Sequence, residues 1–147
     1  MYEEGLTRFA TTQYVPPHAQ DNINQKQGKY AHLTNYSINK NNKRGFVQNL
    51  DADDDIKGSK WSLTGLRKVL RANDIDDVML FNKIKDIIIK TFISVEAELT
   101  SGFSMHVPHR NNCFQLFGFD VMIDDKLNAW LLEVNLSPSL SCDSPLD

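Results

Sequence analysis

The sequence has little cysteine, no long apolar run and none of the glycine-rich loops of common nucleotide sites. Its two cysteines, Cys113 and Cys142, lack the spacing of metal ligands and can be free thiols, as in a reducing cytosol. No apolar run approaches the roughly eighteen residues of a transmembrane helix. Neither G-x-x-x-x-G-K-S/T nor G-x-G-x-x-G occurs, so the sequence predicts no P-loop and no Rossmann site.

The composition is that of an ordinary globular domain. The chain has 147 residues, of which 41% are hydrophobic and 24% charged, and its net charge is −3. This size allows one modest domain with a core, and the charge gives no global indication of nucleic-acid binding. The N-terminal MYEEGLTRFATT lacks the basic and apolar regions of a signal peptide. We therefore expect no nucleic-acid partner and no membrane partner.

Helical periodicity is confined to the middle of the chain. Ser62 is placed to cap a helix with apolar residues over 63–70, and a longer amphipathic helix is predicted over about 76–99, stopped by Ser101-Gly102. Before these helices, residues 2–15 and the first part of KYAHLTNYSINK (29–40) are rich in β-prone residues and predict strand or extended structure. The acidic cluster at 51–55 predicts a solvated loop.

Two β-rich runs near the C-terminus predict a hairpin. CFQLFGFDVMID (113–124) and AWLLEVNLS (129–137) flank a short polar segment. Strands, a loop, helices and a hairpin in this order predict an α+β fold with an antiparallel sheet and packed helices.

Three polar residues interrupt the apolar pattern of this hairpin. Alternation puts Glu133 and Asn135 on one face, and a regular ladder with Asp124 facing Ala129 sets Asp120 opposite Glu133. Such opposed carboxylates need a shared proton, a nearby cation or a divalent metal ion, and these oxygen donors suit Mg²⁺. The alternative is a hairpin with one wet face, but the apolar Leu116, Met122 and Leu131 are expected to share those faces.

Other polar residues fit a charged substrate. Arg8 in a β-prone segment can hold a carboxylate bidentately, Thr34 and Asn35 can bond phosphate or ribose, and Lys60 can offset anionic charge. Each also has a purely structural interpretation: a surface arginine, turn-forming residues and a solvated lysine, respectively. The residues alone leave these alternatives open.

The ordered blocks YEEGLTRFAT, HLTNYSINK, GSKW, VPHRNNCFQLFGFDVMID and WLLEVNLSPSLSCDSPLD resemble the tubulin tyrosine ligase-like family, and its polyglutamylase branch in particular. The blocks span nearly the whole chain, and HLTNYS with FGFD and LLEVNLSPSL is a specific combination. The resemblance implies the C-terminal half of an ATP-grasp core as one partial domain over 1–147, without the N-terminal ATP-binding part. From this we expect the isolated chain to turn over ATP poorly.

The resemblance also implies a reaction and roles for individual residues. The family activates an acceptor carboxylate with ATP and joins it to an amino acid, here free L-glutamate on the glutamates of acidic tubulin tails. By motif, Asp120, Glu133 and Asn135 resemble Mg²⁺ ligands, and Thr34 and Asn35 resemble ATP contacts. Arg8 and Lys60 resemble catalytic and amino-acid contacts, and Tyr36 and Ser37 resemble further amino-acid contacts. The implied location is the cytoplasm and cytoskeleton, including the cilium or basal body.

Two alternatives stay open at this point. The chain can be a non-catalytic microtubule-binding remnant, because a part of the nucleotide site has no match in it. It can also belong to a glycylase or a tyrosine ligase, since Arg8 recognises an α-carboxylate that every amino acid has.

Overall fold

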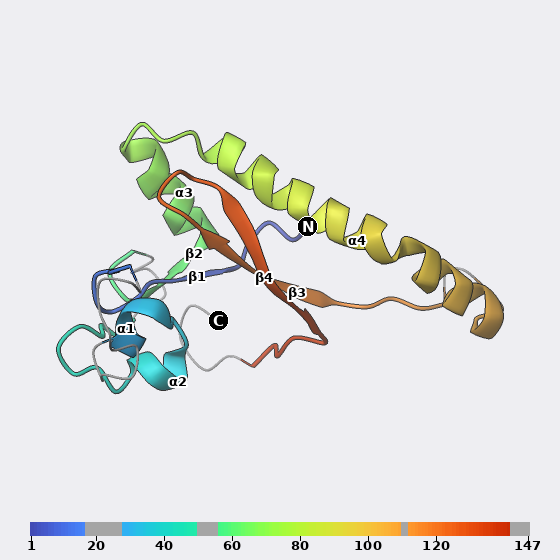
Figure 1. The fold of residues 1–147 in the computed structure, drawn as a ribbon, viewed down its shortest axis with the longest axis horizontal. Helices are drawn as coiled ribbons and strands as arrows, with labels where there is room; N and C mark the ends of the chain where they lie inside the picture. Colours follow the sequence, from blue (N-terminus) through green and yellow to red (C-terminus); the bar gives the residue numbers. More distant parts are fainter. Residues whose placement is uncertain (17–27, 50–55, 110–111, 142–147) are drawn as a thin grey trace. The chain divides into compact units, whose positions relative to one another are not determined.

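The computed structural model describes residues 1–16, 28–49, 56–109 and 112–141, and it has a mixed α+β fold. The elements are β1 (Leu6–Arg8), α1 (Gly28–His32), α2 (Tyr36–Asn39), β2 (Lys60–Ser62), α3 (Leu63–Ala72), α4 (Asp77–His106), β3 (Phe117–Ile123) and β4 (Ala129–Leu136) (Figure 1). The predicted α+β class is confirmed. The acidic cluster at 51–55 and Cys142 lie outside the described residues, whereas Cys113 is an exposed free thiol, as expected.

The chain forms two compact units. The N-terminal unit comprises Tyr2–Asn73 with Ser141–Asp147, and the hairpin unit comprises Asp74–Leu140 with Met1. The N-terminal unit contains the antiparallel sheet β1–β2, and the hairpin unit contains the antiparallel sheet β3–β4.

In the N-terminal unit, strand β2 leads directly into helix α3. The Ser62 hydroxyl accepts a hydrogen bond of 2.8 Å from the Gly65 backbone N–H, which confirms the predicted N-cap. The rings of Phe9 and Trp61 lie 4.4 Å apart between centroids and pack the end of β1 against β2.

The strand predicted at the start of residues 29–40 is wrong. This segment forms the short helices α1 and α2, and of residues 2–15 only Leu6–Arg8 is strand. Helices this short are not stable by propensity alone. Helix α2 is held by side-chain bonds of the buried Asn39, which local β-propensity does not reveal.

The hairpin unit is built around the long helix α4. The Asp76 carboxylate caps it by accepting a bond of 2.9 Å from Met79 N–H. The helix ends at His106, later than predicted, because Gly102 does not adopt the left-handed conformation with which glycine terminates helices. Leu80 and Phe81 are buried in its first turns.

Helix α4 runs beside the hairpin and covers one of its faces (Figure 1). The ring of Phe92 lies 5.2 Å from that of Phe117 and 5.7 Å from that of Phe119, two residues that point to the same side of β3. The opposite face of the hairpin holds the polar residues predicted as metal ligands.

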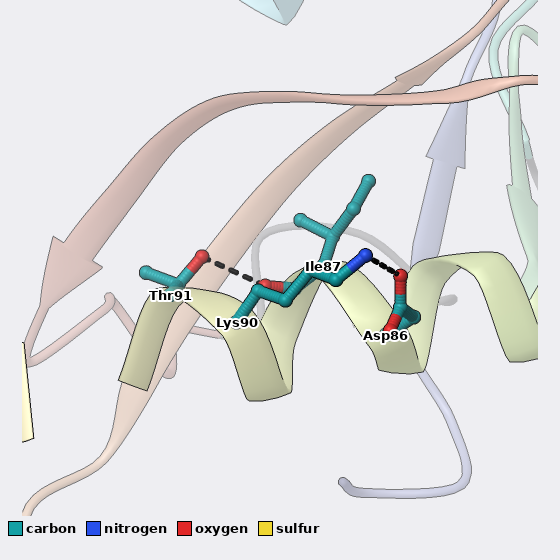
Figure 2. A network of polar contacts seen from close by, with 4 residues as sticks. All are labelled: Asp86, Ile87, Lys90 and Thr91. Atoms are coloured by element: carbon teal, nitrogen blue, oxygen red, sulfur yellow. Dashed lines mark hydrogen bonds and ion pairs between the residues drawn. The ribbon is translucent and has the colours of Figure 1, made fainter. Parts of the chain in front are cut away.

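The solvent side of α4 carries an ion pair beside exposed apolar side chains such as Ile89 and Ile93. Figure 2 shows the ion pair of 2.6 Å between Lys90 Nζ and Asp86 Oδ2, and the bond of 2.8 Å that the Thr91 hydroxyl donates to the Ile87 carbonyl. The two charged side chains are 71% and 57% exposed, so the pair contributes only about 0.3–0.5 kcal/mol. In the part of the chain that is described, no helix has both the length and the apolarity to cross a membrane.

Candidate functional site

The β3–β4 hairpin places two carboxylates opposite each other. Asp120 and Glu133 are direct partners in the antiparallel ladder, as predicted, and both side chains are exposed. Ser137 N–H donates to the Leu116 carbonyl at 3.2 Å, and hydrogen-bonded pairs alternate along such a ladder. Asp120 and Glu133 therefore form a hydrogen-bonded pair, with their Cα atoms about 5.5 Å apart.

The predicted register is wrong by one residue at the turn. Ala129 faces Ile123 rather than Asp124. The ladder is irregular between Asp120 and Val121, where β4 contains Leu132 as an extra residue without a partner. This β-bulge compensates for the one-residue shift at the turn, so Asp120 remains opposite Glu133.

The bulge also changes which apolar side chains share the face of the carboxylates. Leu131 pairs with Val121, so the expectation that it lies beside Glu133 is wrong. Trp130 takes that place, because it pairs with Met122, which points to the same side of β3 as Asp120. Met122 is 51% exposed and Trp130 55% exposed. The outer face is thus polar at one end and apolar at the other.

Asn135 completes the polar end of this face. Its Nδ2 donates to Glu133 Oε1 at 3.3 Å, which confirms that the two side chains lie on one side of β4. Opposite Asn135, a Cβ on Gly118 would lie 3.0 Å from the Pro138 side chain, so the glycine lets Pro138 pack closely against the strand. A half-turn of the Asn135 amide would present its oxygen toward the carboxylates.

Two carboxylates and one amide form a donor set suited to a hard cation. Among the residues that the structure describes, no group of three His, Cys, Asp or Glu side chains could hold a metal ion. A site at this hairpin therefore depends on the Asn135 amide as its third protein ligand.

Asp124 holds the turn of the hairpin and was not singled out from the sequence. Its carboxylate accepts bonds from the backbone N–H groups of Lys126 (2.9 Å) and Asn128 (2.8 Å), from the Asn128 amide (3.0 Å) and from the Trp130 indole (3.0 Å). These bonds, the Asn128 backbone first and the Trp130 indole second, lower the pKa of Asp124 to about 2. The sequence signal that could have revealed this role is an aspartate at the start of a turn. Its carboxylate can accept a hydrogen bond from the backbone N–H two residues later.

The β1–β2 sheet places Arg8 and Lys60 opposite each other. The neighbouring pair is hydrogen-bonded, since Phe9 N–H donates to the Ser59 carbonyl at 3.0 Å. Arg8 and Lys60 are therefore a non-hydrogen-bonded pair, with Cα atoms about 4.5 Å apart and side chains close together. The structure thus joins two predicted substrate contacts that no local sequence pattern connects.

The remaining predicted residues lie on the surface of the N-terminal unit. Thr34 and Asn35 link α1 to α2, Tyr36 and Ser37 begin α2, and all four side chains are exposed. Asn35 occupies the N-cap position but makes no side-chain capping bond. Its side-chain amide is thus not used to cap the helix.

Within each unit the structure groups the predicted residues. Asp120, Glu133 and Asn135 lie together on the hairpin unit, and Arg8 and Lys60 lie together on the N-terminal unit. Sequence reasoning missed Asp124 and also the buried Asn39, which holds the segment that contains Thr34 and Asn35.

Comparison with known proteins gives matches over the whole chain. A family model described as the tubulin-tyrosine ligase family matches residues 1–147. Tubulin polyglutamylase TTLL5 of Mus musculus is 47% identical over 148 residues, which are 100% of this chain and 11% of the relative. Tubulin monoglutamylase TTLL4 of Homo sapiens is 41% identical over 147 residues, or 100% and 12%. Tubulin polyglutamylase TTLL13 of Mus musculus is 45% identical over 152 residues, or 100% and 18%. The chain thus spans less than a fifth of the length of these relatives.

Proposed function

Because the chain belongs to the tubulin-tyrosine ligase family, we propose that it forms part of an ATP-dependent ligase that adds L-glutamate to glutamate side chains of tubulin. The glutamylase names of the relatives support glutamate over glycine or tyrosine as the amino acid. The structural observation that supports a ligase site is the opposed pair of Asp120 and Glu133 with Asn135 beside it. Residues 1–147 would be the C-terminal half of an ATP-grasp core.

The hairpin supplies the residues for the metal. Like charges placed directly opposite each other on a sheet destabilise it by about 0.2–1 kcal/mol, and a cation bound between them reverses this effect. Asp120, Glu133 and Asn135 would hold Mg²⁺, which supplies positive charge against the phosphates of ATP. The exposure of both carboxylates leaves room for the phosphates and water that Mg²⁺ prefers as its other ligands.

The N-terminal unit supplies the contacts for ATP and the amino acid. Thr34 and Asn35 would bond ATP through their exposed hydroxyl and amide groups. Arg8 and Lys60, which lie opposite each other on the β1–β2 sheet, would bind a carboxylate of free glutamate. Tyr36 and Ser37 would add hydrogen bonds to the same substrate.

The reaction has two steps. An acceptor carboxylate oxygen of tubulin attacks the γ-phosphorus of ATP and ADP leaves, which gives an acyl phosphate. The amino nitrogen of free glutamate then attacks the acyl carbon, loses a proton, and phosphate leaves as the isopeptide bond forms. Each step brings several anions together, so the cations at Arg8 and Lys60 would position the reactants and screen their charges. The ligation would take place on microtubules of the cytoskeleton, including those of cilia or basal bodies.

An incorporation assay tests this proposal. The longest reading frame that contains these residues is incubated with microtubules, Mg·ATP and labelled glutamate, with labelled glycine and tyrosine in parallel. Glutamate alone should be incorporated, and Arg8→Ala should raise the KM for glutamate by about tenfold or more through loss of a charge-assisted bond. Arg8→Lys should recover only part of this loss, because lysine cannot bind a carboxylate bidentately.

Three outcomes would count against the proposal. Incorporation of glycine or tyrosine instead of glutamate would change the assigned substrate. Full activity of Asp120→Asn would remove the metal assignment. Co-sedimentation with microtubules without incorporation of any amino acid would favour the non-catalytic binding protein.

A further inference from the structure

Asn39, the last residue of α2, is a buried polar side chain with every donor engaged. It is 2% exposed. Its Nδ2 donates to the carbonyls of Leu33 at 2.6 Å and Asn35 at 3.1 Å, and its Oδ1 accepts from the Thr11 hydroxyl at 2.6 Å. The two carbonyls lie on either side of Thr34, so one amide fixes both ends of the Leu33–Asn35 segment.

The direction of these bonds follows from chemistry. Backbone carbonyls can only accept, so the NH₂ group of Asn39 must face Leu33 and Asn35, and its oxygen must face Thr11. The Thr11 hydroxyl therefore donates to Asn39, and it accepts a bond of 2.9 Å from Asn42 Nδ2. The result is a relay of hydrogen bonds, in which Asn42 donates to the Thr11 hydroxyl and this hydroxyl donates to Asn39.

The relay joins two separate blocks of the sequence. Thr11 follows the strand that contains Arg8, whereas Asn39 and Asn42 follow the segment that contains Thr34. The backbone of Gly45 also packs closely against the Thr11 carbonyl, since a Cβ on Gly45 would overlap the carbonyl oxygen. The segment with Thr34 and Asn35 is thus tied to the end of β1 by bonds that leave little freedom.

We propose that Asn39 is a positioning residue that, through Thr11, holds Thr34 and Asn35 in the geometry that binds ATP. This inference rests on the proposed function, because it assigns Thr34 and Asn35 to the nucleotide. Asn39 does not touch the substrates, and it acts by fixing the backbone on both sides of the two contact residues. Its loss should weaken ATP binding selectively.

Asn39→Asp is the most informative change, because it keeps the shape and replaces the donor with an acceptor. The ionised carboxylate of this variant would repel both carbonyls, so the KM for ATP should rise about tenfold at pH 8. A protonated carboxyl can donate again, so the KM of this variant should fall back toward that of the parent near pH 6. The KM for glutamate should rise less than the KM for ATP, because Arg8 and Lys60, which Asn39 does not contact, would hold the glutamate carboxylate, and general unfolding would not produce this split.

The matched control is Asn73→Asp. Asn73 also donates to the carbonyl four residues before it, that of Val69, at 2.8 Å, but its side chain is exposed at the end of α3. The same substitution there should leave both KM values unchanged.

If Asn39→Asp does not fold, a second pair of variants at Thr11 tests the same positioning role. Thr11→Ser keeps the hydroxyl and should behave as the parent, whereas Thr11→Val removes it and should raise the KM for ATP. The inference is overturned if the parent ligates glutamate but Thr11→Val and Asn39→Asp keep its ATP KM. It is also overturned if the variants raise all KM values equally. A parent without any ligation would instead refute the proposed function, while binding of a fluorescent ATP analogue, weakened by Thr11→Val but not Thr11→Ser, would still support the role of Asn39.

Discussion

Replacing Asp120 with asparagine removes one of two carboxylates that face each other across the β3–β4 hairpin. Like charges directly opposite each other on a sheet destabilise it by about 0.2–1 kcal/mol. Water screens this repulsion because both side chains are exposed. Without a metal ion, the Asp120→Asn variant should therefore be more stable than the parent, with a Tm higher by about 1–8 °C for a unit of this size.

Magnesium should reverse this order. A cation at tenfold its Kd stabilises the folded parent by about 1.4 kcal/mol, and the variant should gain little of this because it lacks one of the two charged ligands. The assay is thermal unfolding of both proteins with a chelator and then with excess MgCl₂. Asp125→Asn is the matched control, since it removes an exposed carboxylate from the turn of the same hairpin.

The reasoning would be refuted by either of two results. One is an Asp120→Asn protein that is no more stable in chelator than Asp125→Asn, because the opposed charges would then not repel each other. The other is a Tm increase with Mg²⁺ that is as large in Asp120→Asn as in the parent, because the metal would then bind elsewhere.

Three further predictions concern stability. The pKa of Asp124 is lowered in the folded state, so ionised Asp124 contributes its full stabilisation above about pH 4 and should lose it as the pH falls toward 2. Urea unfolding across this pH range should show the loss of stability in the parent and not in Asp124→Asn. Gly45→Ala should lower the stability by more than about 1 kcal/mol because its Cβ overlaps the Thr11 carbonyl, whereas Gly102→Ala, with open space around it inside α4, should raise it by about 0.5–1 kcal/mol; equal melting temperatures of the two would contradict this. Ser62→Ala should cost about 1 kcal/mol by removing the cap of α3, measured by the loss of helical circular dichroism on heating, and an unchanged transition would show that the cap is dispensable.

The long helices and the hairpin could be predicted because their information is local. Ser62 and Asp76 are side-chain caps, and the apolar spacing after each of them is helical over many residues. The end of α4 could not be predicted, because a glycine stops a helix only when it turns left-handed, and the sequence alone does not say whether Gly102 does so.

The short helices α1 and α2 could not be predicted from their residues. In α2, local β-propensity is overruled by side-chain bonds of Asn39, one of which, with Thr11, links residues 28 positions apart in the sequence. The same limit applies to Arg8 and Lys60, whose pairing in the β1–β2 sheet has no local pattern.

At the candidate metal site, the grouping of the three polar side chains could be predicted, but their surroundings could not. Alternation is enough to place Glu133 beside Asn135. The pairing of Asp120 with Glu133 was correct, although the assumed regular ladder was not, because the bulge at Leu132 compensates for the shift at the turn. A bulge depends on the twist and packing of both strands, so it leaves no clear pattern in one of them.

The unpaired Leu132 has a consequence for how this hairpin can change over evolution. Deleting it would leave an uninterrupted ladder in which Asp120 still faces Glu133, Val121 still faces Leu131, and Met122 still faces Trp130. The length of the strand on the turn side can therefore change by one residue while Asp120 and Glu133 keep facing each other. We expect homologous hairpins to differ in length by one residue at this position and nowhere between it and Asn135.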